Sequence, residues 1–150
     1  MSNNLPTNSK NLELIPSGLK EEISKNNYEF LLNTNIPLQK RLFILLSMLG
    51  IPSSLLGYDY IKDALFISFE NNYSLPPVSK VLYPTIAKKH GKTSSQIERA
   101  IRHAIEKSTS RCDPKILFFI FGYTINSEKN KITNTEYLSQ LVKFFESMCN

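Results

Sequence analysis

The 150-residue chain has no apolar run long enough to cross a lipid bilayer. The longest run, residues 42–50, is interrupted by Ser47 and is far shorter than the roughly 20 residues that a transmembrane helix needs. The N-terminal residues also lack the charged and then apolar pattern of a secretory signal. We therefore expect no membrane association and a cytoplasmic location.

Motifs for catalysis, metals and cofactors are also missing. The sequence has no Gly-rich phosphate loop, no nucleophile elbow and no pair of carboxylates beside a histidine. Cys112 and Cys149 have no CxxC partner, and neither His90 nor His103 has metal-ligand spacing to a cysteine. The charged neighbours of Cys112 do not mark it as a nucleophile. We expect a protein that is not an enzyme and that needs neither a metal nor a cofactor.

Positive charge, by contrast, is concentrated in one stretch. The formal net charge of the chain is +5, and residues 80–111 contain 8 Lys and Arg residues against 2 Glu. Residues 1–36 contain 3 Lys and 4 Glu, so they contribute nothing to this excess. Such clustering is typical of a surface that binds a nucleic acid. A solvated basic face would have the same composition, so charge alone does not decide between the two.

The spacing of apolar residues predicts an all-α fold of about six helices. The helices are expected at residues 37–49, 58–70, 79–90, 93–107, 113–122 and 135–148, with loops at 71–77 and 125–133. Ser79 is the predicted cap of the third helix and Gly91 its end. Thr93 is the predicted cap of the fourth helix, and Gln96 completes a capping-box pattern there.

Residues 1–35 differ in composition from the rest. Residues 1–16 are polar, rich in Asn and Ser and bounded by Pro6 and Pro16, which predicts a flexible arm. Ser17 is placed to cap a short helix within this arm, with acidic residues near its positive end. We therefore divide the chain into an arm, residues 1–35, and a helical domain, residues 36–150.

Two predicted helices meet across Gly91 and Lys92 with the spacing of a helix-turn-helix at the centre of this domain. In such a unit the second helix enters the major groove of DNA. Its isoleucines face the core, so its other side carries a set of polar residues that we call the reading face: Ser95, Gln96, Glu98, Arg99, Arg102 and His103. Arg suits guanine, Gln suits adenine and Glu suits cytosine. We predict that the reading face contacts base edges.

Four residues around the turn, Lys88, Lys89, Lys92 and Thr93, are predicted to bind DNA phosphates, and we call them the turn cluster. Plainer interpretations stay open. The lysines are compatible with ordinary surface charge, and Glu98 is spaced to form an ion pair with Arg102. An ordinary helical hairpin in a bundle also has the spacing of a helix-turn-helix.

Longer motifs resemble one family. Residues 80–89 read KVLYPTIAKK and residues 98–106 read ERAIRHAIE; shorter matches are GIP (50–52), GYDYIKDAL (57–65), FGYT (121–124) and TNTEY (133–137). About residues 36–148 resemble the C-terminal effector domain of the stage-zero sporulation protein A family of response regulators. The resemblance implies a six-helix, winged-helix-like effector domain. It also implies binding to short DNA boxes, often in tandem as a homodimer, and contact with the sigma subunit of RNA polymerase.

The chain also departs from this family. Family members carry a phosphorylatable receiver domain before the effector domain, and here only about 35 polar residues precede the match. Glu98, Arg99, Arg102 and His103 keep the family pattern, whereas Gln96 replaces an Arg and Thr109 replaces an aromatic residue. We therefore expect a changed target site, or a loss of about 1–3 kcal/mol where one bidentate base contact is missing.

Two functional hypotheses follow. The first is a sequence-specific, sporulation-related DNA-binding transcription regulator of the cytoplasm, associated with the nucleoid and acting without a receiver domain on double-stranded DNA. The second is a protein-binding antagonist that sequesters the sigma subunit or the full-length regulator. The basic residues of the reading face and the turn cluster favour the first hypothesis, since an antagonist has no need of them.

Overall fold

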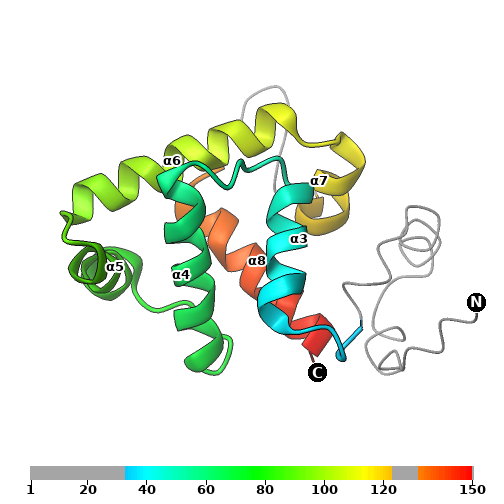
Figure 1. Ribbon diagram of the computed structural model, residues 1–150, viewed down its shortest axis with the longest axis horizontal. Coiled ribbons are helices and arrows are strands. Elements are labelled where there is room, and N and C mark those ends of the chain that lie inside the picture. The colour runs from blue at the N-terminus through cyan, green and yellow to red at the C-terminus, as the bar shows by residue number, and fades with distance from the viewer. Residues whose placement is uncertain (1–32, 123–131, 150) are drawn as a thin grey trace, which may run out of the picture.

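The computed structural model describes residues 33–122 and 132–149, which form six α-helices and one π-helical turn (Figure 1). The helices are α3 (Leu38–Met48), α4 (Leu56–Glu70), the π-helical turn η2 (Val78–Leu82), α5 (Tyr83–His90), α6 (Ser94–Arg111), α7 (Pro114–Phe121) and α8 (Asn134–Cys149). The described ranges contain no β-strand, so the predicted all-α fold is confirmed and no β-wing is seen among them. The predicted arm up to residue 32, with its short helix, lies outside the described residues. So do residues 123–131, which include most of the loop predicted at 125–133.

Most predicted helix ends lie within two residues of their observed positions, but the fourth helix continues to Arg111, four residues beyond its predicted end at 107, and the start of the third is wrong. Ser79 does not cap it, because η2 begins at Val78 and Pro77 occupies the capping position without a side-chain hydrogen bond. The amide of Leu82 donates to the carbonyl of Pro77 over 3.0 Å. The donor lies five residues after the acceptor, which is the hydrogen-bond pattern of a π-helical turn. This turn ends one residue before Tyr83, the first residue of α5, and Pro84, which lacks an amide hydrogen, follows in the first turn of that helix.

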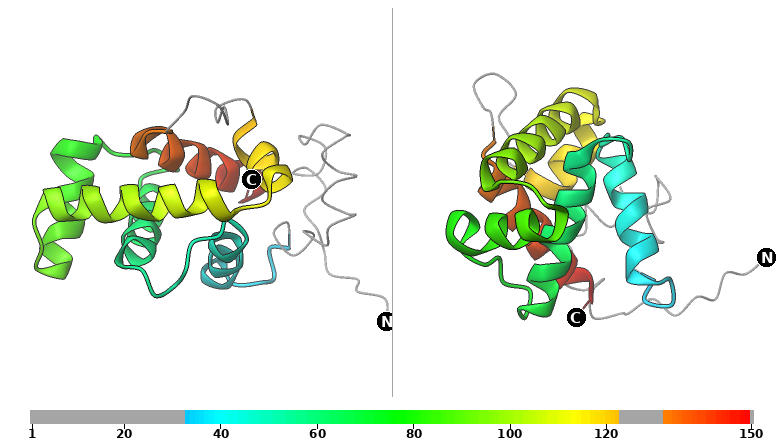
Figure 2. Two further views of the ribbon diagram at one scale, coloured as in Figure 1. Left: turned by 90° about the horizontal axis from the view of Figure 1, so that it is seen from above. Right: turned by 60° about the vertical axis from the view of Figure 1, so that its left-hand side comes forward.

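Helix α6 is the longest element and lies along one edge of the molecule. It packs against α4, α5 and α8, while α7 packs against α8. Figure 1 shows α6 along the upper edge, and the view from above in Figure 2 shows its whole length in front of α4 and α8. Its outer side is therefore presented to the surroundings along the helix.

One hydrophobic core joins the described helices. Its largest fully buried side chains include Tyr137 and Phe145 from α8, Leu42 and Leu46 from α3, and Ile61 from α4. Helix α6 contributes a buried stripe of Ile97, Ile101, Ala104 and Ile105. This stripe is the one that the sequence predicts, so the opposite side of α6 faces outward.

Gly57 sets how closely α4 approaches α6. A Cβ atom at this position would lie 2.2 Å from the carbonyl oxygen of Ala100 and 2.7 Å from the Cβ of Ala104. Both distances are shorter than real carbon contacts, and the nearer atom belongs to a helix backbone that cannot rotate away. Only glycine at residue 57 therefore permits this crossing of the two helices.

Replacing Gly57 with Ala is expected to lower the free energy of unfolding by about 3 kcal/mol or more, because one helix must shift to admit the methyl group. The measurement is urea denaturation followed by circular dichroism.

Gly91→Ala is the matched control. A Cβ at residue 91 meets nothing within 4 Å, so its cost is limited to the positive φ of +65°, roughly 1 kcal/mol. Equal losses in the two variants would show that the helix crossing does not depend on Gly57.

Candidate nucleic-acid interface

Helices α5 and α6 are joined by a tight turn that begins at Gly91. Gly91 has φ 65° and ψ 37°, the left-handed conformation that ends a helix, and the amide of Lys92 donates to the carbonyl of Ala87 over 2.9 Å. Thr93 then caps α6. The helix-turn-helix predicted from the sequence is therefore present, with α6 as its second helix.

The start of α6 is closed by a complete capping box. The Gln96 amide N–H donates to Oγ1 of Thr93 over 3.2 Å, and the Thr93 amide N–H donates to Oε1 of Gln96 over 2.9 Å. Two backbone donors that would otherwise lack helical partners are satisfied in this way. The side chain of Gln96 is thus already bonded within the protein.

Hydrogen bonds from α8 hold α6 in place along its inner side. Nδ2 of Asn134 donates to the carbonyl of Glu98 over 3.1 Å and to the hydroxyl of Tyr83 over 3.0 Å, which ties α8 to both helices of the helix-turn-helix. Farther along, the hydroxyls of Ser108 and Tyr137 lie 2.6 Å apart in the core. Burial raises the pKa of Tyr137 above its usual value, so this hydroxyl stays protonated.

The structure places the six residues of the reading face together on the outer side of α6. All are exposed except Glu98, which is half-buried. Arg99 is at the centre of this side, and its guanidinium makes no hydrogen bond or ion pair within the described residues. Arg102 is exposed too, but its Nη1 lies 3.0 Å from Oε1 of Glu98, the ion pair that the sequence spacing allows. Whether these side chains contact bases remains a prediction.

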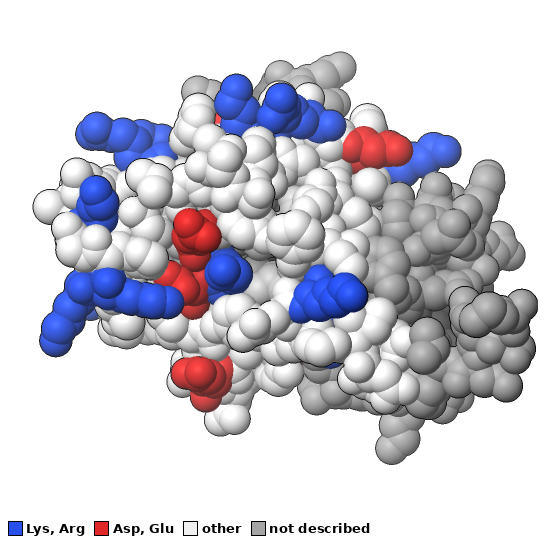
Figure 3. All heavy atoms as spheres, viewed as in Figure 1, with Lys and Arg blue, Asp and Glu red and all other residues white. Residues whose placement is uncertain are grey.

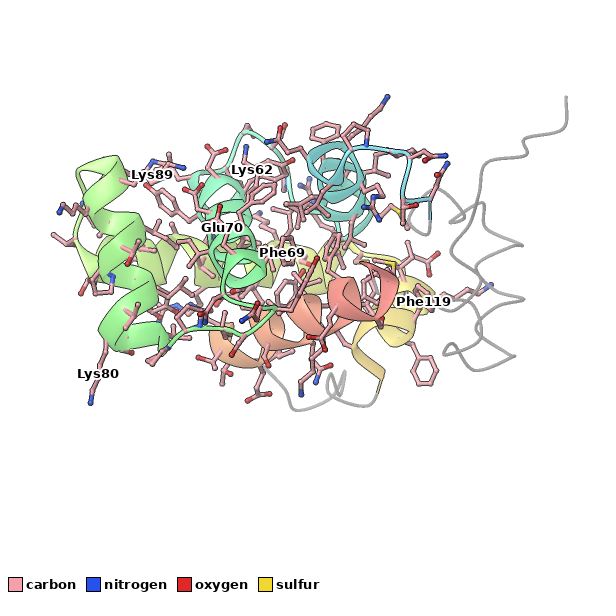
Figure 4. The ribbon with its side chains drawn as sticks, turned by 90° about the horizontal axis from the view of Figure 1, so that it is seen from below. Lys62, Phe69, Glu70, Lys80, Lys89 and Phe119 are labelled. Carbon is pink, nitrogen blue, oxygen red and sulfur yellow. The ribbon has the colours of Figure 1, made fainter. Side chains whose placement is uncertain are left out.

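The turn cluster is exposed, and one of its members is already paired. Nζ of Lys89 lies 2.7 Å from Oδ1 of Asp63 on α4, and Nε2 of His90 lies 2.6 Å from Oδ2 of the same carboxylate. Figure 4 shows Lys89 at the end of α5 pointing toward α4, whereas Lys80 points away from the molecule. Lys89 therefore fixes α5 to α4, a role that the sequence did not indicate. Lys88, Lys92 and Thr93 are exposed at the turn.

Asp63, the carboxylate that contacts Lys89 and His90, is a residue that sequence reasoning missed. It lies between the buried residues Ile61 and Leu65 of α4 and is itself only 9% exposed. The ring of His90 also packs edge-on against Tyr60, with centroids 4.9 Å apart. No pattern within α4 links Asp63 to a lysine 26 residues later, because their contact depends on how the two helices pack.

Basic side chains are conspicuous on this part of the surface. Figure 3 shows Lys and Arg side chains along the upper edge over α6 and around α5, with some acidic side chains among them. A cationic surface around an exposed helix is suited to a polyanion, because each bound phosphate releases condensed counterions.

Other chemistries find little support among the described residues. These residues contain no cluster of three or more His, Cys, Asp or Glu that could hold a metal, and none of their helices could span a membrane. Cys112 is buried, and its Sγ donates to the carbonyl of Met48 over 3.3 Å. Burial, reinforced by Asp113, raises the pKa of this thiol to about 11, so it is a poor nucleophile at neutral pH.

One family model matches the chain. Residues 43–144, from α3 into α8, match the family described as the C-terminal domain of the sporulation initiation factor Spo0A. The match includes the whole helix-turn-helix and all residues of the reading face and the turn cluster. It agrees with the resemblance seen in the sequence motifs.

The capping role of Gln96 predicts a stability effect. Gln96→Ala should lower the free energy of unfolding by about 1 kcal/mol, because it removes the bond to the Thr93 amide. Gln96→Glu should match or exceed the original stability, since a carboxylate both completes the box and favours the positive end of α6. Thermal denaturation followed by circular dichroism measures both.

Ser95→Ala provides the comparison, because Ser95 is exposed in the same turn and should change stability by less than about 0.5 kcal/mol. A loss in Gln96→Glu as large as that in Gln96→Ala would contradict the capping role.

Proposed function

Because the chain belongs to the family of the Spo0A C-terminal domain, we propose that it is a sequence-specific DNA-binding regulator of sporulation-related genes. The observation that carries this proposal is the exposed outer side of α6, with Arg99 at its centre, in an intact helix-turn-helix. Such a helix fits the major groove, where its first turns reach base edges. The protein acts where the chromosome lies, in the cytoplasm.

Arg99 is the principal base reader in this proposal. Its guanidinium has no competing partner among the described residues, so it can donate two hydrogen bonds to guanine O6 and N7. Arg102 is less available than Arg99, because its Nη1 already donates to Glu98. Ser95 and His103 are exposed on either side of Arg99 and contribute secondary contacts.

Gln96 is a weaker reader than its position suggests. A bidentate contact with adenine needs its amide oxygen as an acceptor, and this oxygen already accepts from the Thr93 amide. Reading adenine therefore requires this oxygen either to accept a second hydrogen bond while it is held in the capping position or to leave the cap. We infer that Gln96 chiefly holds the start of α6.

Affinity in this proposal comes from phosphate contacts by Lys88, Lys92 and Thr93 around the turn. Lys89 contributes less than these, because its ammonium is already paired with Asp63. The 150 residues are proposed to suffice for binding, without a receiver domain, and tandem boxes would bind two copies.

The alternative is an antagonist that binds the sigma subunit or the full-length regulator. An antagonist would not need an outward-facing Arg99 next to exposed lysines, so the charges of this surface favour DNA. A pull-down with sigma subunit distinguishes the two. Strong sigma binding by a chain that shows no DNA affinity would replace the first proposal with the second.

The experiment that tests the proposed function is selection of bound duplexes from a randomised library, followed by sequencing. Enrichment of one short motif containing guanine is expected, and paired motifs at fixed spacing would indicate two copies. Selection should be repeated at several salt concentrations, because phosphate binding alone is strong at low salt. No enriched motif at any salt concentration would overturn sequence-specific binding.

Arg99→Ala is expected to reduce discrimination at one base pair of the selected motif by about 1–3 kcal/mol. Lys92→Ala should instead weaken binding about equally on selected and scrambled duplexes and reduce the salt slope by about one. Fluorescence anisotropy titrations at several salt concentrations measure both effects. If Arg99→Ala weakened all duplexes equally, Arg99 would be a phosphate contact and not a base reader.

A further inference from the structure

Helix α6 has a hollow on each flank, and the two differ in charge. The hollow toward η2 and the start of α8 has a volume of about 420 Å³, and its charged lining residues are Arg102, Glu98 and Glu106. The guanidinium of Arg102 is bonded to Glu98, so this flank presents an excess of negative charge. Phosphate groups would be repelled there.

The opposite hollow, of about 410 Å³, lies between the start of α4 and α6, and we call it the α4–α6 groove. Tyr60 and Ala100 supply apolar surface, and the charged lining residues are Lys92 and Arg99. Gln96 and His103 add polar groups, and no carboxylate is among the lining residues. The α4–α6 groove is therefore the cationic flank of α6.

Leu56, the first residue of α4, is the unusual member of this groove. This residue is 59% exposed, the highest value among the large exposed hydrophobic residues of the described chain. It lies in the same hollow as Lys92, Arg99 and His103. An apolar side chain within a cationic groove matches a ligand that alternates negative and apolar groups, as deoxyribose and phosphate do along a DNA strand.

We propose that the part of the α4–α6 groove beside Leu56 and Lys92 holds the sugar–phosphate backbone of one DNA strand, with Leu56 packed against a deoxyribose and Lys92 against a phosphate. Arg99, on the α6 side of the groove, keeps its guanidinium for the base edges. The inference rests on the proposed function and adds the direction in which the duplex lies. The flank with Glu98 and Glu106 faces away from this strand. The α4 helix thereby becomes part of the interface, although its sequence carries no basic residue before Lys62.

Charge also distinguishes this occupant from a protein segment. A peptide in the groove would need acidic residues against Lys92 and Arg99, and its binding would not follow the number of phosphates. A DNA strand predicts a salt dependence whose slope changes by about 0.9 for each phosphate that the protein neutralises.

The test adds a charge of either sign at residue 56. Leu56→Lys should raise affinity about fivefold on both selected and scrambled duplexes and steepen the salt slope by about one. Leu56→Glu should weaken binding about equally on both duplexes. Its carboxylate favours the start of α4, so loss of binding would not reflect unfolding.

Phe43→Lys is the matched control. Phe43 is another large hydrophobic residue with high exposure, 52%, but it lies on α3 outside the helix-turn-helix. Its substitution adds the same charge to the chain and should change neither affinity nor salt slope. Circular dichroism confirms that each variant is folded before anisotropy is measured.

The outcomes separate the two proposals. If the unmodified chain binds its selected motif but Leu56→Lys behaves like Phe43→Lys, the groove inference is wrong and the proposed function stands. If the unmodified chain binds no duplex, both proposals fall. An increase in affinity with Leu56→Lys that is confined to the selected motif would also overturn the groove inference, because a backbone contact acts on every sequence.

Discussion

The close contact between Gly57 and α6 is the constraint on which the interface depends. With no side chain at residue 57, the carbonyl of Ala100 and the methyl group of Ala104 lie directly against the α4 backbone. This contact determines the rotation of α6 about its own axis. Once Ala100 and Ala104 face α4, the isoleucines must enter the core and Arg99 must point outward. The direction of the proposed base contact is thus set by a glycine on another helix.

Several residues of the reading face make hydrogen bonds within the protein in addition to the DNA contacts proposed for them. Gln96 closes the start of α6, and Glu98 is bonded to Arg102 through its side chain and to Asn134 through its carbonyl. These bonds hold the helix rigid before a ligand arrives, which lowers the entropy lost on binding. They also restrict what the same side chains can read. Arg99 combines an outward position with a guanidinium that is not committed elsewhere among the described residues.

Local signals in the sequence were enough to predict the helix-turn-helix. Gly91 ends one helix, and the spacing of Thr93 and Gln96 starts the next, because these signals act within a few residues. Contacts between distant segments could not be predicted in the same way. The ion pair of Lys89 with Asp63 and the close approach at Gly57 both depend on helix packing. The sequence predicts Ser79 as a cap because a polar residue before an apolar run resembles one, whereas in the structure the π-helical turn already begins at Val78.

A close backbone contact and hydrogen bonds from α8 together fix α6, which explains why the surface suits a duplex more than a flexible ligand. Helix α6 is held by a backbone contact to α4, by Asn134 near its start and by Tyr137 near its end, so its exposed residues keep a fixed spacing. A fixed row of side chains has an advantage only against a partner that is itself regular, such as the major groove. The unequal charges on its two flanks then favour one orientation of that partner. A rigid helix with one cationic flank would therefore distinguish the direction of the DNA as well as its presence.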